Sequence, residues 1–281
     1  MVDLAHLTLA DAARMIAARE LSSLELVEAT FARIAAFDAR LDSHVTLMSK
    51  SALAAARQAD AEIAAGRRRG PLHGVTVALK DIFDTEGVLT AGGSKTGLGR
   101  VPDRDAETVR RLRTAGAVIT GKLATHEFAH GGPSFDLPWP PARNPWNVAH
   151  FSGGSSSGSA VAVAAGFCLG ALGTDTGGSI RGPAALSGTT GLMPSYGLVS
   201  RRGVIPNSFS FDHCGPLART AEDCGLLLDV LAGYDPQDPR SSAEPQHPPP
   251  ASMAGLHVGL LRHFWEEDLA VAPEMVTAFF F

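Results

Sequence analysis

The sequence predicts an α/β fold built on a mainly parallel sheet. Helical and strand-like patterns alternate: a strand is expected from Val75 to Asp81, a helix from Asp105 to Ala115 and a second strand from Ala117 to Thr120. Alternation of this kind favours parallel strands joined by helices. The chain can also bury a large core, because its 281 residues are 45% hydrophobic and 19% charged. These observations indicate a globular protein of one large or two modest domains.

Three helices are expected before the first strand. Apolar residues recur every three or four positions from Thr8 onward, and Ser22-Ser23 precede a second helical run from Leu24 to Phe37. An alanine-rich helix from Ser51 to Ala65 then ends at Gly66. We interpret all three helices as packing elements without chemistry.

The first strand ends in a lysine that has two interpretations. Lys80 follows four nearly continuous apolar positions. A lysine at a strand end can extend its ammonium into water, which would make it a surface residue. If the side chain is buried instead, its pKa falls and it can act as a neutral base near pH 7.

Two glycine–serine turns form the most informative part of the chain. Gly153–Ser159 and Gly177–Ser179 bracket an apolar run from Ala160 to Leu172, which carries no charge and is expected to be buried. Ser155 and Ser179 are therefore expected on opposite sides of a hydrophobic layer. Glycines beside a serine leave backbone N–H groups open to a ligand, which suits a nucleophile. A flexible linker would not continue into such an apolar run, and the chain lacks the G-x-x-x-x-G-K-[ST] pattern of a phosphate-binding loop.

Two further segments carry weaker signals. Residues 133–146 hold five prolines and are expected to form a rigid loop, in which Trp139 and Trp146 either line a substrate mouth or anchor the loop. Residue types alone would also fit a catalytic cluster further along the chain, although no partner spacing supports one. The members of that cluster are Asp212, His213 and Cys214.

The last third of the chain combines a helix, a connection and a strand. Thr220 is expected to cap a helix from Ala221 to Leu231, and a proline-rich connection follows. Leu256–Leu261 is expected to be a buried strand. We treat the whole chain, residues 1–281, as a single domain with four parts: N-terminal helices 1–66, a core 67–233, the connection 234–251 and an incomplete C-terminal part 252–281.

Composition argues against several classes of protein. The net charge of −5 comes without a basic block other than Arg67–Arg69, so nucleic acid is not an expected partner. No stretch of eighteen residues is apolar enough to predict a membrane helix. The N-terminus lacks the pattern of a signal peptide, and three cysteines without zinc-site spacing suggest reduced thiols, so a cytoplasmic location is expected.

Three motifs together resemble the amidase signature family. They are G-P-L-H-G-V-T-V-A-L-K-D (70–81), G-G-S-S-S-G-S (153–159) and G-T-D-T-G-G-S-I-R-G-P-A (173–184), and they occur in the family's order. The resemblance implies the amidase-signature fold, a mixed and mostly parallel central sheet with helices on both faces. It also implies amide hydrolysis by a Ser–cis-Ser–Lys triad and an acyl-enzyme.

The resemblance assigns roles to individual residues of this sequence. Ser179 matches the nucleophile, Ser155 the bridging serine that follows a cis peptide bond, and Lys80 the base. The backbone N–H groups of Thr176, Gly177 and Gly178 match the oxyanion hole. Asp175 and Arg181 are expected to support that loop. The implied substrate is a small-molecule amide, with no metal and no cofactor, and a homodimer is kept open as the assembly state.

Some positions depart from particular branches of the family. The A subunit of tRNA-dependent amidotransferases usually has Gln where this chain has Gly182, Lys where it has Met193, and M-G-S-S in place of residues 130–133. These differences favour a stand-alone amidase over a glutaminase subunit. Gly182 also argues against the small dicarboxylate monoamides that malonamidase-like members hold with an arginine there.

The length of the chain is the largest departure. Family chains normally continue well beyond residue 281, so we expect a C-terminally truncated form of the fold. Two alternatives therefore stand beside a stand-alone amidase: the glutamine amidase subunit of a tRNA-dependent amidotransferase, and a truncated non-catalytic product that retains the motifs.

Overall fold

The computed structural model describes residues 5–244, 252–269 and 271–279. The chain divides into two compact units, Met1–Glu244 and Pro245–Phe281, which are described separately. The first unit contains all three motifs.

A six-stranded mixed sheet forms the centre of the first unit, in the order β1-β3-β2-β4-β6-β5. The middle strand β2 pairs in parallel with β3 on one side and with β4 on the other, whereas the outer pairings are antiparallel. The strands are β1 (His44–Leu47), β2 (Thr76–Lys80), β3 (Val118–Leu123), β4 (Gly170–Asp175), β5 (Thr190–Gly191) and β6 (His213–Ala218). The predicted α/β class and the parallel centre of the sheet are confirmed.

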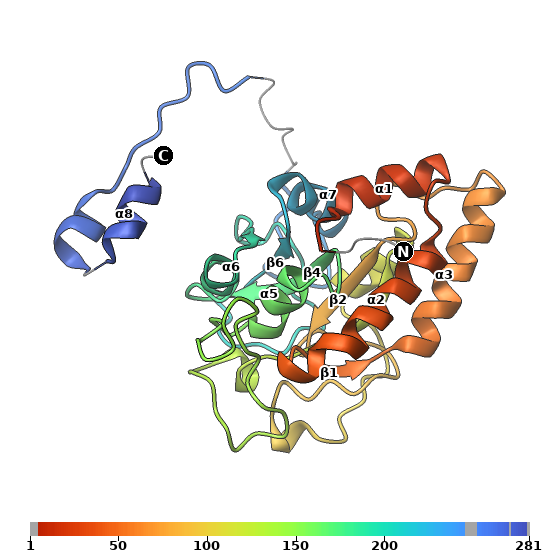
Figure 1. Ribbon diagram of the computed structural model, residues 1–281, viewed down its shortest axis with the longest axis horizontal. Coiled ribbons are helices and arrows are strands. Elements are labelled where there is room, and N and C mark those ends of the chain that lie inside the picture. Colours follow the sequence, from red (N-terminus) through yellow and green to blue (C-terminus); the bar gives the residue numbers. More distant parts are fainter. Residues whose placement is uncertain (1–4, 245–251, 270, 280–281) are drawn as a thin grey trace. The chain divides into compact units, whose positions relative to one another are not determined.

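Helices cover both faces of this sheet (Figure 1). Alternate side chains of β2 point to opposite faces, as expected for a strand. Val77 and Leu79 pack in a cluster that includes α1, α4 and α7, while Ala78 packs in a second cluster with α5 and α6. The helices are α1 (Leu9–Ala18), α2 (Ser23–Phe37), α3 (Ser49–Ala64), α4 (Glu107–Thr114), α5 (Ser157–Ala164), α6 (Arg181–Ser187) and α7 (Ala221–Leu231).

Capping residues explain where two of these helices begin. Ser22 precedes α2, where its hydroxyl accepts the Glu25 N–H and the Glu25 carboxylate accepts the Ser22 N–H in return. Thr220 and Asp223 form the same reciprocal pair at the start of α7. Each box satisfies two N–H groups that the first helical turn leaves free. The predicted cap at Thr220 is confirmed.

The apolar run between the two glycine–serine turns folds as a helix followed by a strand. Its first half is α5, its second half enters β4, and both are buried. Such a helix–strand pair reverses the chain direction, so the two turns end at the same edge of the sheet. The Ser156 N–H accordingly donates to the Ser179 carbonyl at 3.2 Å. The expectation that Ser155 and Ser179 lie on opposite sides of a hydrophobic layer is therefore wrong.

The second unit contains little regular structure among its described residues. It has a π-helical turn, Phe264–Asp268, and a short helix α8, Pro273–Phe279. The predicted buried strand Leu256–Leu261 is wrong, because these residues form no strand and Leu256, Val258 and Leu261 are exposed. A strand needs a neighbour for its backbone groups, and the described part of this unit provides none. No described helix has the length and apolarity needed to cross a bilayer.

We expect Leu172→Ala to lower the free energy of unfolding by about 2–5 kcal/mol, since Leu172 in β4 is almost completely buried and its loss leaves a cavity. Urea unfolding followed by circular dichroism would measure the change. Leu98→Ala is the matched control, because Leu98 is half-exposed and its truncation should cost about 0.5 kcal/mol or less. Equal losses in the two variants would contradict the assigned core.

Candidate active site

Lys80 occupies the end of the central strand, where its side chain is 0% exposed. Its Nζ donates to Ser155 Oγ at 2.7 Å and to Thr174 Oγ1 at 2.8 Å. Burial lowers the pKa of Lys80 to about 7, against the weaker opposing effect of nearby acidic groups. Of the two interpretations of this lysine, the structure supports the buried one.

Ser155 follows a cis peptide bond with Gly154 and lies just before α5. Its carbonyl accepts the His126 N–H at 3.2 Å, and its side chain is almost completely buried. A Cβ on Gly154 would lie 2.0 Å from His126 Cε1, so only glycine fits beside this imidazole. The backbone bond from His126 and the hydrogen bond from Lys80 hold Ser155 in this position.

The neighbouring serines of the same turn have structural partners. Ser156 Oγ donates to the Thr174 carbonyl and accepts the Thr174 N–H, both at 3.2 Å. Ser157 lies in the first turn of α5 and its hydroxyl contacts the Ala124 carbonyl at 3.5 Å. Ser156 therefore ties the serine turn to β4.

Asp175 organises the loop that leads to Ser179. Its carboxylate accepts the backbone N–H of Gly178 at 2.7 Å and of Ile180 at 3.1 Å, as well as two N–H groups of the Arg181 guanidinium at 2.9 and 3.0 Å. Burial alone would raise the pKa of Asp175, but the hydrogen bonds from Arg181 and the backbone outweigh it and lower the pKa to about 2. The carboxylate is thus charged and holds the loop in place.

The three predicted oxyanion donors are the backbone N–H groups of Thr176, Gly177 and Gly178, and they differ in whether they already have a partner. The Gly178 N–H is engaged by Asp175, and Gly178 has a φ of 119°, which favours glycine. Thr176 and Gly177 make no backbone N–H bond to any described residue. The Thr176 hydroxyl donates to Asp212 Oδ1 at 2.6 Å, which fixes the loop from its other side.

Asp212, His213 and Cys214 do not form a nucleophile–base cluster in the structure. Asp212 accepts hydrogen bonds from Thr176, Asn207 and Ser208, while His213 Nδ1 lies 2.6 Å from the Phe211 carbonyl. Burial raises the pKa of the Cys214 thiol to about 12, so it carries no reactive thiolate.

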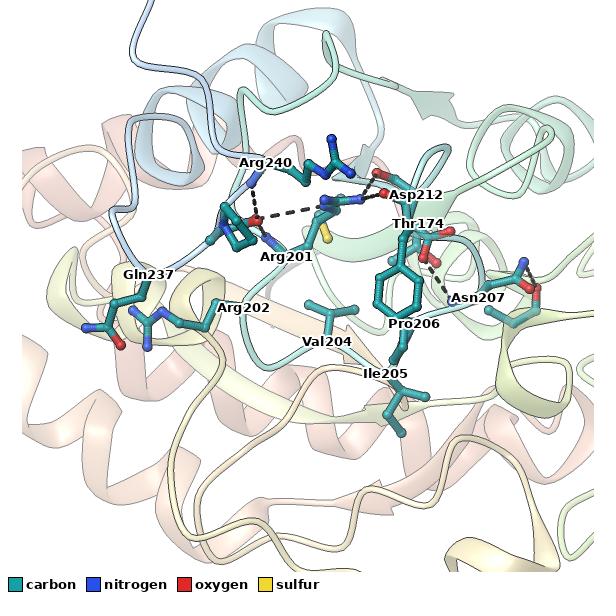
Figure 2. Close-up of a pocket in the computed structure, with 15 residues that line it drawn as sticks. Thr174, Arg201, Arg202, Val204, Ile205, Pro206, Asn207, Asp212, Gln237 and Arg240 are labelled. Carbon is teal, nitrogen blue, oxygen red and sulfur yellow. Dashed lines mark hydrogen bonds and ion pairs between the residues drawn. The ribbon is translucent and has the colours of Figure 1, made fainter.

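A cavity of about 420 Å³ opens beside these residues (Figure 2). Thr174 and Cys214 line it at the ends of two antiparallel strands, and the segments 201–209 and 237–240 supply most of the remaining wall. Thr174 also accepts the hydrogen bond from Lys80, so one lining residue contacts the lysine. Lys80, Ser155 and Ser179 are not themselves among the lining residues of this cavity. Trp139 and Trp146 lie outside this cavity, and Trp146 Nε1 donates to the Ser187 carbonyl at 2.8 Å.

Sequence reasoning missed three residues of the site. Thr174 is the second acceptor for Lys80, His126 packs on the cis peptide, and Asp212 holds Thr176. Thr174 lies inside the third motif, one residue before Asp175. Its position in this motif could have identified it as a site residue. The contacts of His126 and Asp212 join segments that are distant in sequence, and no local pattern indicates them.

A family model described as Amidase matches residues 25–278. The chain belongs to the amidase family. The resemblance drawn from the three motifs is thereby confirmed.

Relatives of two kinds support this membership. The chain is 48% identical over 276 residues to the A subunit of the glutamyl-tRNA(Gln) amidotransferase of Anaeromyxobacter sp. (strain K), covering 97% of this chain and 56% of the relative. Among solved structures, the native peptide amidase from Stenotrophomonas maltophilia matches with a TM-score of 0.81 and 43% identity, over 86% of this chain and 51% of that one. The A subunit of the amidotransferase from Thermotoga maritima matches with a TM-score of 0.74 and 31% identity, over 87% and 51%. The chain spans about half the length of the relatives it matches.

We expect Asp175→Asn to destabilise the protein by about 2 kcal/mol at pH 7, because a pKa lowered from 3.8 to about 2 stabilises the folded state by that amount. The stabilisation is complete above the unfolded pKa and is lost as the pH falls through the folded one. The difference between variant and parent should therefore shrink strongly at pH 2.5, as measured by urea unfolding. Asp229→Asn, at an exposed position of α7, should change little at either pH.

Proposed function

We propose that the chain carries the acylation machinery of an amide hydrolase, with Ser179 as nucleophile, Ser155 as relay and Lys80 as base. The observation that carries this proposal is the 2.7 Å contact between a fully buried lysine amine and the Ser155 hydroxyl. With a pKa of about 7, a large fraction of Lys80 is neutral at physiological pH and can accept a proton.

The proposed reaction begins with two coupled proton transfers. Ser155 passes its proton to Lys80 Nζ and takes the proton of Ser179 Oγ, which then attacks the carbonyl carbon of the amide. The hydrogen bond from Ser156 N–H to the Ser179 carbonyl supports this route, because it holds the two serine turns together.

The negative charge that develops on the carbonyl oxygen needs backbone donors. We assign the N–H groups of Thr176 and Gly177 to it, and we give Gly178 a supporting role because its N–H serves Asp175. One such donor is typically worth about 3–4 kcal/mol of the barrier. Asp175, Arg181 and Asp212 position this loop and touch no reacting atom.

Collapse of the intermediate breaks the C–N bond, and the leaving amine takes its proton from Ser155, which is recharged by Lys80. Water then hydrolyses the acyl-enzyme and releases the acid. Apart from this water, each step uses side chains and backbone groups of the site. Esters and carbamates present the same acyl carbon and fall within the proposed substrate range.

A second candidate function follows from the relatives. The 48% identity to the A subunit of a glutamyl-tRNA(Gln) amidotransferase favours a glutamine amidase that works with partner proteins. Gly182, Met193 and the sequence at 130–133 differ from the residues usual in that subunit. Release of ammonia from glutamine only in the presence of co-purifying partners would select this candidate over a stand-alone amidase.

Covalent labelling tests the nucleophile directly. A fluorophosphonate should modify the full chain at Ser179, because an activated serine hydroxyl attacks phosphorus as it attacks an acyl carbon. Peptide mass spectrometry locates the label. Ser179→Ala should abolish it, while Ser195→Ala, at an exposed position, should leave it unchanged. A label on any other serine would overturn the assignment.

The pH dependence of turnover tests the base. Only neutral Lys80 accepts a proton, so kcat/KM for an aryl amide should rise with pH and level off above an apparent pKa of about 7. Lys80→Ala should reduce kcat/KM by about 10²–10⁴-fold, whereas Lys50→Ala at an exposed position should not. Unchanged turnover in Lys80→Ala would remove Lys80 from the mechanism.

A further inference from the structure

The cavity that Thr174 lines also contains charged groups of both signs. These groups differ in how many of their hydrogen-bonding atoms already have partners. Both oxygens of Asp212 accept bonds, from the Thr176 hydroxyl and from the backbone N–H groups of Asn207 and Ser208. Both oxygens of Asp238 accept a backbone N–H, from Arg240 and from Arg201. The acidic groups of the cavity are therefore already committed to holding its walls.

Two of the three arginines of the cavity, Arg201 and Arg240, retain donors without a hydrogen bond to a described residue. Arg201 is held rigidly, with its guanidinium 4.9 Å over the Tyr196 ring and Nη1 donating to the Phe209 carbonyl at 2.8 Å. Its Nε is buried and makes no hydrogen bond with any described residue, and its ion pair with Asp238 is long, at 3.8 Å. A buried donor without an acceptor is costly and indicates a missing partner.

The other two arginines differ in how they are paired. Arg202 is fully occupied by Glu107 at 2.6 Å and Asp235 at 2.8 Å. The exposed guanidinium of Arg240 makes no ion pair or hydrogen bond with any residue that the structure describes. Arg201 and Arg240 both line the cavity, and Figure 2 labels them near one another. The guanidinium of Arg240 and the buried Nε of Arg201 each make no hydrogen bond with a described residue.

Much of the remaining lining is apolar, although Asn207 and Gln237 also belong to it, and one lining residue has an uncommon backbone conformation. Val204, Ile205 and Phe209 form a hydrophobic wall, and Phe209 is 75% exposed at the cavity. Phe128 and Ala129 both have left-handed backbone angles, with φ of 47° and 61°, and Ala129 lines the cavity. Left-handed angles at residues other than glycine are costly and cluster at ligand sites.

We propose that this cavity binds the part of the substrate remote from the scissile carboxamide, and that this part is an apolar spacer ending in a carboxylate. Arg201 and Arg240 receive the carboxylate, and Val204, Ile205 and Phe209 contact the spacer. The inference rests on the proposed function and adds the substrate class. A cationic ligand fits less well, because the carboxylates of the cavity already accept backbone donors while the arginines retain donors.

The volume and position of the cavity agree with this assignment. A volume of about 420 Å³ lies in the usual range of roughly 300–1,000 Å³ for small-molecule sites. Thr174 lines the cavity and accepts the hydrogen bond from Lys80, so one side chain separates a ligand here from the proposed base. Arg201 and Arg240, and not residue 182, would hold the carboxylate. The lack of an arginine at position 182 therefore argues against small dicarboxylate monoamides but not against monoamides with longer spacers.

Binding to a chain that cannot turn over tests the inference. The ligands are the monoamides of adipic, pimelic and suberic acid, each compared with the methyl-ended amide of equal length, hexanamide, heptanamide or octanamide. Isothermal titration of the 281-residue chain with Ser179→Ala should show at least about tenfold tighter binding for an acid-ended member of one pair, since a hydrogen bond to a charged group is worth about that much. Equal binding in all three pairs would overturn the proposal.

Arginine variants in the same background locate the effect. Arg201→Met and Arg240→Met should each reduce the preference for the carboxylate to threefold or less, whereas Arg104→Met, an exposed arginine outside the cavity, should retain it. Thermal unfolding checks that each variant is folded; should Arg201→Met unfold, the exposed Arg240→Met decides. A preference that survives Arg240→Met together with a folded Arg201→Met would overturn the proposal.

Ammonia release by the unsubstituted chain separates this inference from the proposed function. Carboxylate-dependent binding without turnover would overturn the hydrolase and leave the binding site standing. Turnover of the methyl-ended amides without any preference in binding would support the hydrolase and overturn the substrate class.

Discussion

The site depends on a lysine amine that is buried against hydroxyl groups and not against a carboxylate. Lys80 meets Ser155 and Thr174, and burial lowers its pKa to about 7. Lys122 on the adjacent strand is equally buried but has Asp81 at 3.5 Å, and its pKa is lowered less, to about 8. Lys122 instead donates to the Phe83 carbonyl, which makes it a structural cation. Two buried lysines on neighbouring strands thus differ because of their partners.

The loop after β4 is fixed from two sides by carboxylates. Asp175 gathers backbone N–H groups and Arg181 on one side, and Asp212 holds the Thr176 hydroxyl on the other. Asp212 also fixes the segment that walls the cavity, through the N–H groups of Asn207 and Ser208. The buried side chain of Asp212 therefore holds both the loop with the proposed oxyanion donors and the wall of the proposed substrate cavity. A change in one of these two segments is expected to affect the geometry of the other.

The parallel centre of the sheet explains why distant motifs meet. Lys80 ends β2 and Asp175 ends β4, and these two strands are paired in parallel, so their carboxyl ends lie at the same edge. The helix α5 also starts at that edge, so Ser155, which lies just before it, is close to the residues that follow β4. A helix beginning where two parallel strands end brings a lysine and two serine turns together from three separate parts of the sequence.

The sequence by itself determined the α/β class, most helix positions, the cap at Thr220 and the family, because these follow from local periodicity and from contiguous motifs. It also named Lys80, Ser155 and Ser179 as candidate site residues. Only the tertiary structure decided that Lys80 is buried, that the two serine turns are adjacent, that Gly178 serves Asp175, and that Leu256–Leu261 forms no strand. Burial, strand pairing and hydrogen-bond choice depend on residues far apart in the chain, and local patterns carry no information about which neighbour will be there.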